Sequence, residues 1–265
     1  MQCSHCETVC YCCHGHGALH HTSHGCYPVM VHHAGGERCL VTTRDVSQGE
    51  LLYVEHPLVV GPNHAGDPVC LTCHTPVDGS TECGKCGYPV CSEECAQGEE
   101  HRQECGVLRN IRLDREAYNY HIVLPLRLLL SQSVTAVSSL TKLLVDHEEH
   151  RRKSDYWEVA ENNIVSLLCT NSADHGWSRK EVRRAVGVLE VNAYEIESYG
   201  NSGIRGLFPL SSLLNHGCID NCTMVMMTKF PYTNTVLAAR NLKAGEEILS
   251  LQGSSDRLHF RLGGK

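Results

Sequence analysis

The chain of 265 residues lacks a long hydrophobic run, a secretion signal and any long run of lysine or arginine. Its longest apolar stretch, IVLPLRLLL, is interrupted by Pro125 and Arg127 and is far too short to span a bilayer. No apolar signal segment follows Met1, so we expect a soluble protein of the nucleus, the cytoplasm or both. With a net charge of -7 and no basic stripe, we expect protein or small-molecule partners, no direct nucleic-acid binding and no membrane.

Cysteine is abundant instead, with seventeen in the chain. Small secreted proteins use many cysteines for disulfides, but here the cysteines are clustered with histidines and no secretion signal precedes them. In a reducing compartment this pattern indicates zinc.

The strongest cluster lies between residues 70 and 105, with the pattern C-x2-C, x9, C-x2-C, x4, C-x3-C, x5, H-x3-C. Two-residue spacers let both thiolates of a tight turn reach one ion, and a three-residue spacer puts two ligands one helical turn apart. Four spaced pairs are not expected of unrelated core cysteines. The predicted ligands are Cys70, Cys73, Cys83, Cys86, Cys91, Cys95, His101 and Cys105. They make two closed tetrahedral sites, which stabilise folding and leave no open position for catalysis.

The order of these pairs resembles the MYND zinc finger, whose two sites interleave. The resemblance implies one zinc held by Cys70, Cys73, Cys91 and Cys95 and another held by Cys83, Cys86, His101 and Cys105. Spacing alone also permits sequential pairing. The five residues before His101 are fewer than MYND fingers usually have there. These fingers bind short, often proline-rich peptides, so such peptides and repressor proteins are expected partners.

Residues 1–30 are also rich in Cys and His and resemble the rear half of a second MYND finger, with the first C-x2-C missing. One zinc could be held there by Cys3, Cys6, His24 and Cys26. A disordered metal-binding tail is the alternative.

Two distant segments, residues 39–55 and 235–251, read alike: an apolar run, an Arg with Asp or Asn, a Gly-Glu turn and a second apolar run. Gly49 and Gly245 permit the turn, so each segment is predicted to form a hairpin. Between them, YWEVAENNIVSLL, KEVRRAVGVLEV, YNYHIVLPLRLLLSQ and VTAVSSLTKLLVDHEEHRRK are predicted helices. Asp155 with Glu158 and Ser178 with Glu181 have the spacing of capping boxes.

Taken in order, GGERCLVTTRDVSQGELLYVEHPLVVGP, the eight-ligand finger, the helical block, EVNAYEI, GLFPLSSLLNHGCIDN and AARNLKAGEEI resemble a SET-MYND protein. The resemblance implies an α+β protein, a β-rich SET fold with an inserted MYND zinc finger and a helical insert. Its implied divisions are 35–62 for the first part of SET, 70–105 for the finger, 106–190 for the helical insert and 191–265 for the core of SET. It implies S-adenosylmethionine-dependent methylation of a lysine on a histone or another protein, linked to transcriptional regulation.

The resemblance also implies the cofactor contacts. Asn215 and His216 of NHGC match the family's N-H-S-C segment, and Asn192 of VNAYEI matches another cofactor position. Gly36 and Arg38 lie where the family's opening loop meets the same ligand. The alternative for His216 is a buried, hydrogen-bonded histidine that only stabilises this segment and does not contact the cofactor.

Three departures from the family qualify the expected activity. Gly217 replaces a serine, and Leu251 or Gln252 stands where the family has a tyrosine that orients the substrate amine. The sequence stops at RLHFRLGGK, before the family's cysteine-rich post-SET segment, whose zinc the resemblance would have Cys218 share. A truncated gene model and a real loss of catalysis are both open explanations. No residue is therefore assigned to catalysis. An inactive zinc-binding adaptor or corepressor scaffold is the second hypothesis.

Overall fold

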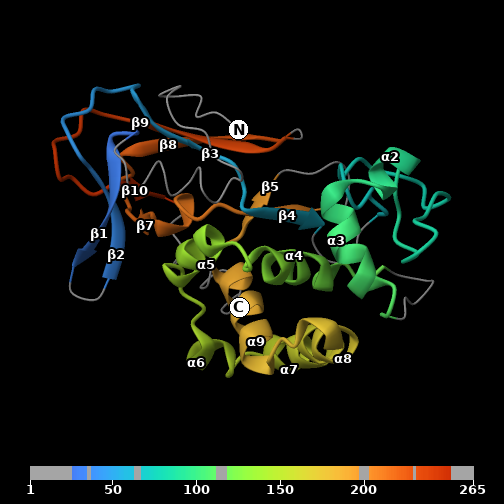
Figure 1. Ribbon diagram of the computed structural model, residues 1–265. Helices are drawn as coiled ribbons and strands as arrows, with labels where there is room; N and C mark the ends of the chain where they lie inside the picture. Colours follow the sequence, from blue (N-terminus) through green and yellow to red (C-terminus); the bar gives the residue numbers. More distant parts are fainter. Residues whose placement is uncertain are drawn as a thin grey trace. The chain divides into compact units, whose positions relative to one another are not determined.

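The computed structural model describes residues 26–34, 37–62, 67–111, 118–196, 203–228 and 231–251 (Figure 1). The chain divides into two compact units. The first contains Met1–Leu58, Val134–Val145 and Leu207–Lys265, and the second contains Val59–Ser133 and Asp146–Gly206. The predictions for Cys3, Cys6, His24, Gly36 and Gln252 lie outside the described residues.

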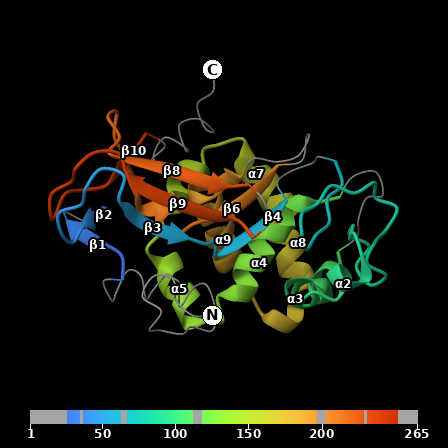
Figure 2. The same ribbon diagram turned by 90° about the horizontal axis from the view of Figure 1, so that it is seen from above.

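The first unit contains most of the strands. They are β1 (Val29–Ala34), β2 (Glu37–Thr42), β3 (Leu51–Glu55), β7 (Asn215–His216), β8 (Cys222–Met227), β9 (Thr233–Ala238) and β10 (Leu249–Ser250), with helix α5 (Thr135–Lys142) and the 3-10 turn η4 (Ser211–Leu213). β1 pairs with β2, β9 lies antiparallel between β3 and β8, and β10 is parallel to β7. Figure 2 shows β3, β9 and β8 side by side. Along β9 the side chains alternate between buried and half-buried, as expected for a strand with one face on the core.

The two similar segments, residues 39–55 and 235–251, do not fold into two hairpins, and that prediction was wrong. They run antiparallel to one another instead: β3 pairs with β9 and Val46 bridges Leu242. The apolar alternation identifies strands but does not choose their partners. The predicted turns are present, with φ of 80° at Gly49 and 79° at Gly245.

Each of these two segments also caps the turn of the other. The Oδ1 of Asp45 accepts a hydrogen bond from the Ala244 N–H at 3.0 Å. The Oδ1 of Asn241 accepts one from the Gln48 N–H at 2.8 Å. Asp45 and Asn241 occupy the same place in the two sequences, as do Gln48 and Ala244. The sequence repeat is therefore a pair of mutually stabilising segments.

The second unit is mainly helical around a small sheet. Its helices are α2 (Glu93–Ala96), α3 (Glu99–Leu108), η1 (Tyr120–Ile122), α4 (Val123–Ser131), α6 (Glu148–Arg151), α7 (Tyr156–Ala160), η2 (Glu161–Val165), α8 (Ser166–Asn171), η3 (Ala173–His175) and α9 (Arg179–Asn192). Its strands β4 (Val59–Pro62), β6 (Ile204–Leu207) and β5 (Tyr194–Ile196) form one sheet in that order. α4 is apolar on nearly every side and is buried from Val123 to Leu129.

The helical predictions are correct in type and less accurate at the ends. The capping box of Ser178 and Glu181 is present at the start of α9. The box predicted at Asp155 is absent, because Asp155 is itself helical and its side chain caps nothing. The stretch predicted as one helix before Gly176 contains a π-helical segment, η2, between α7 and α8. The predicted helix 134–153 is two helices, α5 and α6, separated near His147, whose φ is 43°.

Within the described residues, no single helix is long and apolar enough to cross a membrane. Tyr120–Ser131 and Thr135–Lys142 pass that test only when taken together, on length and composition.

Candidate metal centre and cofactor segment

Two tight turns of the same design carry the first four predicted metal ligands. In one, the His74 N–H donates to the Cys70 carbonyl at 2.9 Å, and the Cys70 N–H donates to the Thr75 carbonyl at 2.9 Å. In the other, the Gly87 N–H donates to the Cys83 carbonyl at 2.8 Å. The residue after each C-x2-C is left-handed, with φ of 60° at His74 and 76° at Gly87. Each turn therefore directs its two thiols to one point.

The remaining four predicted ligands lie in or directly before two helices. Ser92 caps α2 by accepting from the Cys95 N–H, and Cys91 directly precedes that cap. His101 and Cys105 lie one turn apart on α3. The spacing of three residues places both members of this pair on one helical face.

The eight donors fall into two clusters, and within each cluster the donor atoms all lie within 4.8 Å of one another. The clusters are Cys70, Cys73, Cys91 and Cys95, and Cys83, Cys86, His101 and Cys105. This is the interleaved grouping that the finger resemblance implies, and not the sequential pairing that spacing alone permits. His101, placed after an unusually short spacer, lies within the second cluster.

The donor set fits a tetrahedral ion. The sulfur atoms of Cys73 and Cys91 are 3.6 Å apart, and those of Cys83 and Cys105 are 3.8 Å apart. Four thiolates at about 2.3 Å from one ion lie about 3.8 Å from each other, whereas a disulfide would bring two sulfurs to about 2.05 Å. Both clusters can thus hold a metal ion. The second cluster is fully buried, while Cys91 of the first is exposed.

A buried ion pair lies directly behind the second cluster. Arg127 donates to both carboxylate oxygens of Glu104, at 2.7 and 2.8 Å. The Glu104 carboxylate also contacts Nδ1 of His101, at 3.4 Å. Nε2 of the same ring lies 3.7 Å from the Cys86 sulfur. Burial would raise the pKa of Glu104, but Arg127 and His101 outweigh it and hold that pKa below its usual value. The carboxylate is therefore ionised beside the imidazole.

The stretch that contains Asn215 and His216 forms strand β7, parallel to β10. The Asn215 amide donates to Glu247 at 2.8 Å, and Nδ1 of His216 lies 2.9 Å from the Leu251 carbonyl. Nε2 of His216 is 3.6 Å from the sulfur of Cys218, which is exposed. Both predicted cofactor residues thus also connect β7 to the chain around β10.

The other predicted cofactor residues lie in different parts of the chain. Arg38 is on β2 in the first unit and donates to the Lys142 carbonyl at 3.2 Å. Asn192 is the last residue of α9 in the second unit, is buried, and donates to the Val188 carbonyl at 2.7 Å.

A buried carboxylate organises the turn that leads into β7. Glu55 accepts hydrogen bonds from the N–H groups of Leu210 and Ser211, at 2.7 and 3.0 Å, and from the Ser211 hydroxyl at 2.8 Å. Asn234 donates to the same hydroxyl at 2.8 Å. Burial raises the pKa of Glu55 to about 7, against the hydrogen bonds that lower it. Glu55 thereby connects β3 to the turn that precedes β7.

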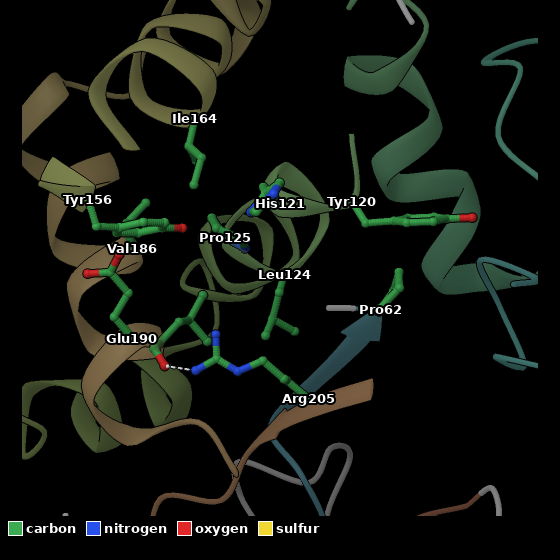
Figure 3. Close-up of a pocket in the computed structure, with 11 residues that line it drawn as sticks. Pro62, Tyr120, His121, Leu124, Pro125, Tyr156, Ile164, Val186, Glu190 and Arg205 are labelled. Carbon is green, nitrogen blue, oxygen red and sulfur yellow. Dashed lines mark hydrogen bonds between the residues drawn. The ribbon is translucent and has the colours of Figure 1, made fainter. Parts of the chain in front are cut away.

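The second unit also contains a pocket of about 370 Å³, including solvent at its mouth (Figure 3). Its polar lining comes from His121, Tyr156, Glu190 and Arg205, and the Arg205 guanidinium donates to the Leu189 carbonyl at 3.0 Å. Burial, and then the charge of Arg205, lower the pKa of His121. Among the residues that the structure describes, no predicted cofactor or metal residue lines this pocket.

The family model of the SET domain matches residues 37–250. This chain belongs to the SET-domain family. The match includes both the Asn215 and His216 segment and the eight clustered donors. The α+β fold class and the SET domain interrupted by a cysteine-rich insertion of zinc-finger type are therefore confirmed.

This SET-domain chain is similar to a SET domain-containing protein and to two histone-lysine N-methyltransferases. SET domain-containing protein SmydA-8, isoform A, of Drosophila melanogaster is 30% identical over 223 residues, which are 80% of this chain and 47% of that protein. Histone-lysine N-methyltransferase ASHR1 of Arabidopsis thaliana is 27% identical over 234 residues, 80% and 46% of the two chains. Histone-lysine N-methyltransferase Smyd1 of Mus musculus is 23% identical over 168 residues, 59% and 34%.

The SET-domain chain spans about half the length of the first two of these relatives and a third of Smyd1. A crystal structure of the SET domain of LSMT bound to lysine and AdoHcy is similar over 89% of this chain and 52% of its own, with 15% identity and a TM-score of 0.39. Similarity at that level identifies no site residue.

Several residues that shape this SET domain were not predicted. Glu104 and Arg127 had weak signals, a charge inside HRQEC and a charge inside a run of leucines. Asn221 gave no signal in the sequence. Its buried side-chain amide donates to the Glu247 carbonyl at 2.8 Å, and its Oδ1 accepts from the Leu249 N–H at 2.8 Å. A buried amide that bonds to main chain has no periodic pattern, so only the folded chain reveals it.

Proposed function

We propose that this protein is an S-adenosylmethionine-dependent methyltransferase acting on a lysine of a histone or another protein. The observation that carries the proposal is the SET-domain match over residues 37–250, which includes the NHGC segment. Histone-lysine methyltransferases among its relatives support it. By the same resemblance, the protein acts in transcriptional regulation.

Asn215, His216, Asn192, Gly36 and Arg38 are the residues proposed to hold the cofactor. When bound, S-adenosylmethionine supplies an electrophilic methyl group on a sulfonium sulfur. The chain's own task is then to bind the cofactor, to orient the acceptor amine and to exclude water, because a neutral amine in line with the methyl needs alignment more than acid or base assistance.

Zinc is the proposed ion of both clusters. Thiolates with one imidazole are typical ligands of structural zinc, and all coordination positions are taken by the chain. The ions would therefore stabilise the insertion and take no part in methyl transfer. The finger is proposed to recruit protein partners, among them proline-rich peptides.

Isothermal titration calorimetry with S-adenosylmethionine tests cofactor binding. We expect saturable binding that Asn215→Ala weakens and that Asn162→Ala, an exposed asparagine far from this segment in sequence, leaves unchanged. Because Asn215 also donates to Glu247, thermal unfolding of each variant should be recorded. Absence of binding at millimolar cofactor to a folded chain would exclude the enzyme.

A zinc-stabilised adaptor without methyltransferase activity is the second candidate function. The observation that favours it is Leu251, a 58% exposed side chain without a hydroxyl, near the place of the family's tyrosine. Loss of such a positioning contact costs about 1.4 to 4 kcal/mol of activation free energy. Transfer of labelled methyl to histones or to a cell extract by the intact protein would exclude the adaptor, whereas cofactor binding without transfer would favour it.

A further inference from the structure

Arg127 contacts residues that neighbour the ligands of both metal clusters, without being a ligand of either. Besides the two bonds to Glu104, it donates to the Leu71 carbonyl at 2.6 Å and to the Val60 carbonyl at 2.5 Å. It also lies 3.3 Å from Nε2 of His74, which must accept because a guanidinium only donates. Leu71 and His74 belong to the turn that holds Cys70 and Cys73, so one side chain from α4 fixes the first cluster's turn.

Arg127 acts on the second cluster indirectly, through Glu104. The carboxylate contacts Nδ1 of His101 and thereby favours the tautomer that leaves Nε2 to face Cys86. His101 and Glu104 are both fully buried. Histidines that bind metals commonly donate their second nitrogen to a carboxylate, which fixes the ring orientation and raises its basicity.

The backbone of His74 adds an independent observation. Its left-handed conformation, with φ of 60°, is unfavourable for a residue with a β-carbon. Glycine occupies the equivalent position, Gly87, in the second turn. A buried imidazole held against Arg127 gives a reason for a strained residue in place of glycine.

We propose that Glu104 and Arg127 are positioning residues for the metal ions: Glu104 orients His101 toward the second ion, and Arg127 orients Glu104 and clamps the Cys70 turn around the first. This inference rests on the proposed zinc occupancy of the two clusters. It makes retention of the two ions interdependent, because one guanidinium supports both. It also connects the cysteine-rich insertion to α4 and β4 of the same unit.

Zinc retention in the full chain provides the test. Each variant is loaded with Zn²⁺ and challenged with a chromophoric chelator, and the ions released per chain are counted. We expect Glu104→Gln to release one of the two ions at about 10- to 100-fold lower chelator concentration. Arg127→Lys keeps the charge without the planar fork, and we expect both ions to be retained less tightly. Retention of both ions at the wild-type level in either variant would overturn the inference.

Glu190→Gln is the matched control, because Glu190 pairs with the buried Arg151 in the same unit and touches no metal ligand. It is expected to lower stability without changing zinc release. A change as large as that of Glu104→Gln would show that loss of any buried ion pair weakens the clusters, and would overturn the positioning role. Wild-type protein that holds no zinc would instead exclude the zinc assignment itself.

Co²⁺ substitution gives a readout of ligand geometry. The absorption bands of the Cys₃His cluster should shift in Glu104→Gln and stay unchanged in Glu190→Gln.

If Glu104→Gln does not fold, His101→Cys supplies a second route. Cysteines four apart are already clustered at Cys91 and Cys95, directly before and within α2, and a thiolate has no ring to orient. In the His101→Cys background, Glu104→Gln should therefore leave zinc retention unchanged. Loss of an ion there would show that Glu104 does not act through the imidazole.

Discussion

Gly217, in place of the family's serine, is predicted to be required by its neighbour on β10. A β-carbon built at residue 217 would lie 2.8 Å from the β-carbon and 3.1 Å from Cδ1 of Leu249. Carbon atoms in contact are normally about 3.5 to 4.0 Å apart, so Gly217→Ala would have to push β10 away from β7 by several tenths of an ångström or more. Overpacking of this kind costs about 1 to 3 kcal/mol.

The partner residue allows a double-mutant cycle. Because the shorter contact is made by the β-carbon of Leu249, Leu249→Ala should rescue Gly217→Ala only slightly, whereas Leu249→Gly should rescue it well. Contacting residues typically show coupling energies of about 0.5 to 3 kcal/mol. Denaturant unfolding at equilibrium measures each term.

Gly106→Ala is the control, since nothing lies within 4 Å of its added β-carbon in the exposed part of α3. It should be neutral or stabilising by about 1 kcal/mol, as alanine favours helices over glycine. A cost below about 0.5 kcal/mol for Gly217→Ala, or equal rescue by Leu249→Ala and Leu249→Gly, would refute the steric reasoning, because neither could follow from a clash of β-carbons.

Three further predictions concern stability. Because the folded pKa of Glu55 is raised from 4.5 to about 7, its contribution is present below pH 4.5 and lost as pH rises to 7; the difference in unfolding free energy between wild type and Glu55→Gln should fall across that window. Gly187→Ala should destabilise by about 1 to 3 kcal/mol, since its β-carbon would lie 2.8 Å from the β-carbon of Asp146. Ser178→Ala should cost about 1 kcal/mol through loss of the capping box with Glu181, measured by thermal unfolding.

Short-range chemistry made the metal ligands predictable. Paired spacings place two donors on one turn or one helical face, so the eight ligands could be named from sequence. Their interleaved grouping came from family resemblance, since spacing does not decide which turn meets which helix. Glu104 and Arg127 escaped prediction because a buried ion pair between distant elements leaves no local pattern.

The strands show a similar limit. Apolar alternation and Gly49 and Gly245 identified the strands and turns of the two similar segments, but the choice of partner depends on packing across the unit. The helix predicted at Tyr156 also failed in detail, because propensity does not foresee a π-helical insertion such as η2. The place of Asn221 depends entirely on tertiary contacts.

The pairing of β3 with β9 has a consequence for synthesis of the chain. Glu55 pairs with Asn234, so β3 is synthesised 179 residues before the part of β9 that pairs with it. At about 5 to 20 residues per second, that delay is roughly 10 to 40 s on the ribosome. Meanwhile Leu52 and Tyr53, fully covered in the finished fold, have no sheet to join, and an unpaired apolar strand is prone to aggregate. All eight clustered donors have been synthesised by residue 105, so the insertion can take up metal while β3 still lacks its partner strand.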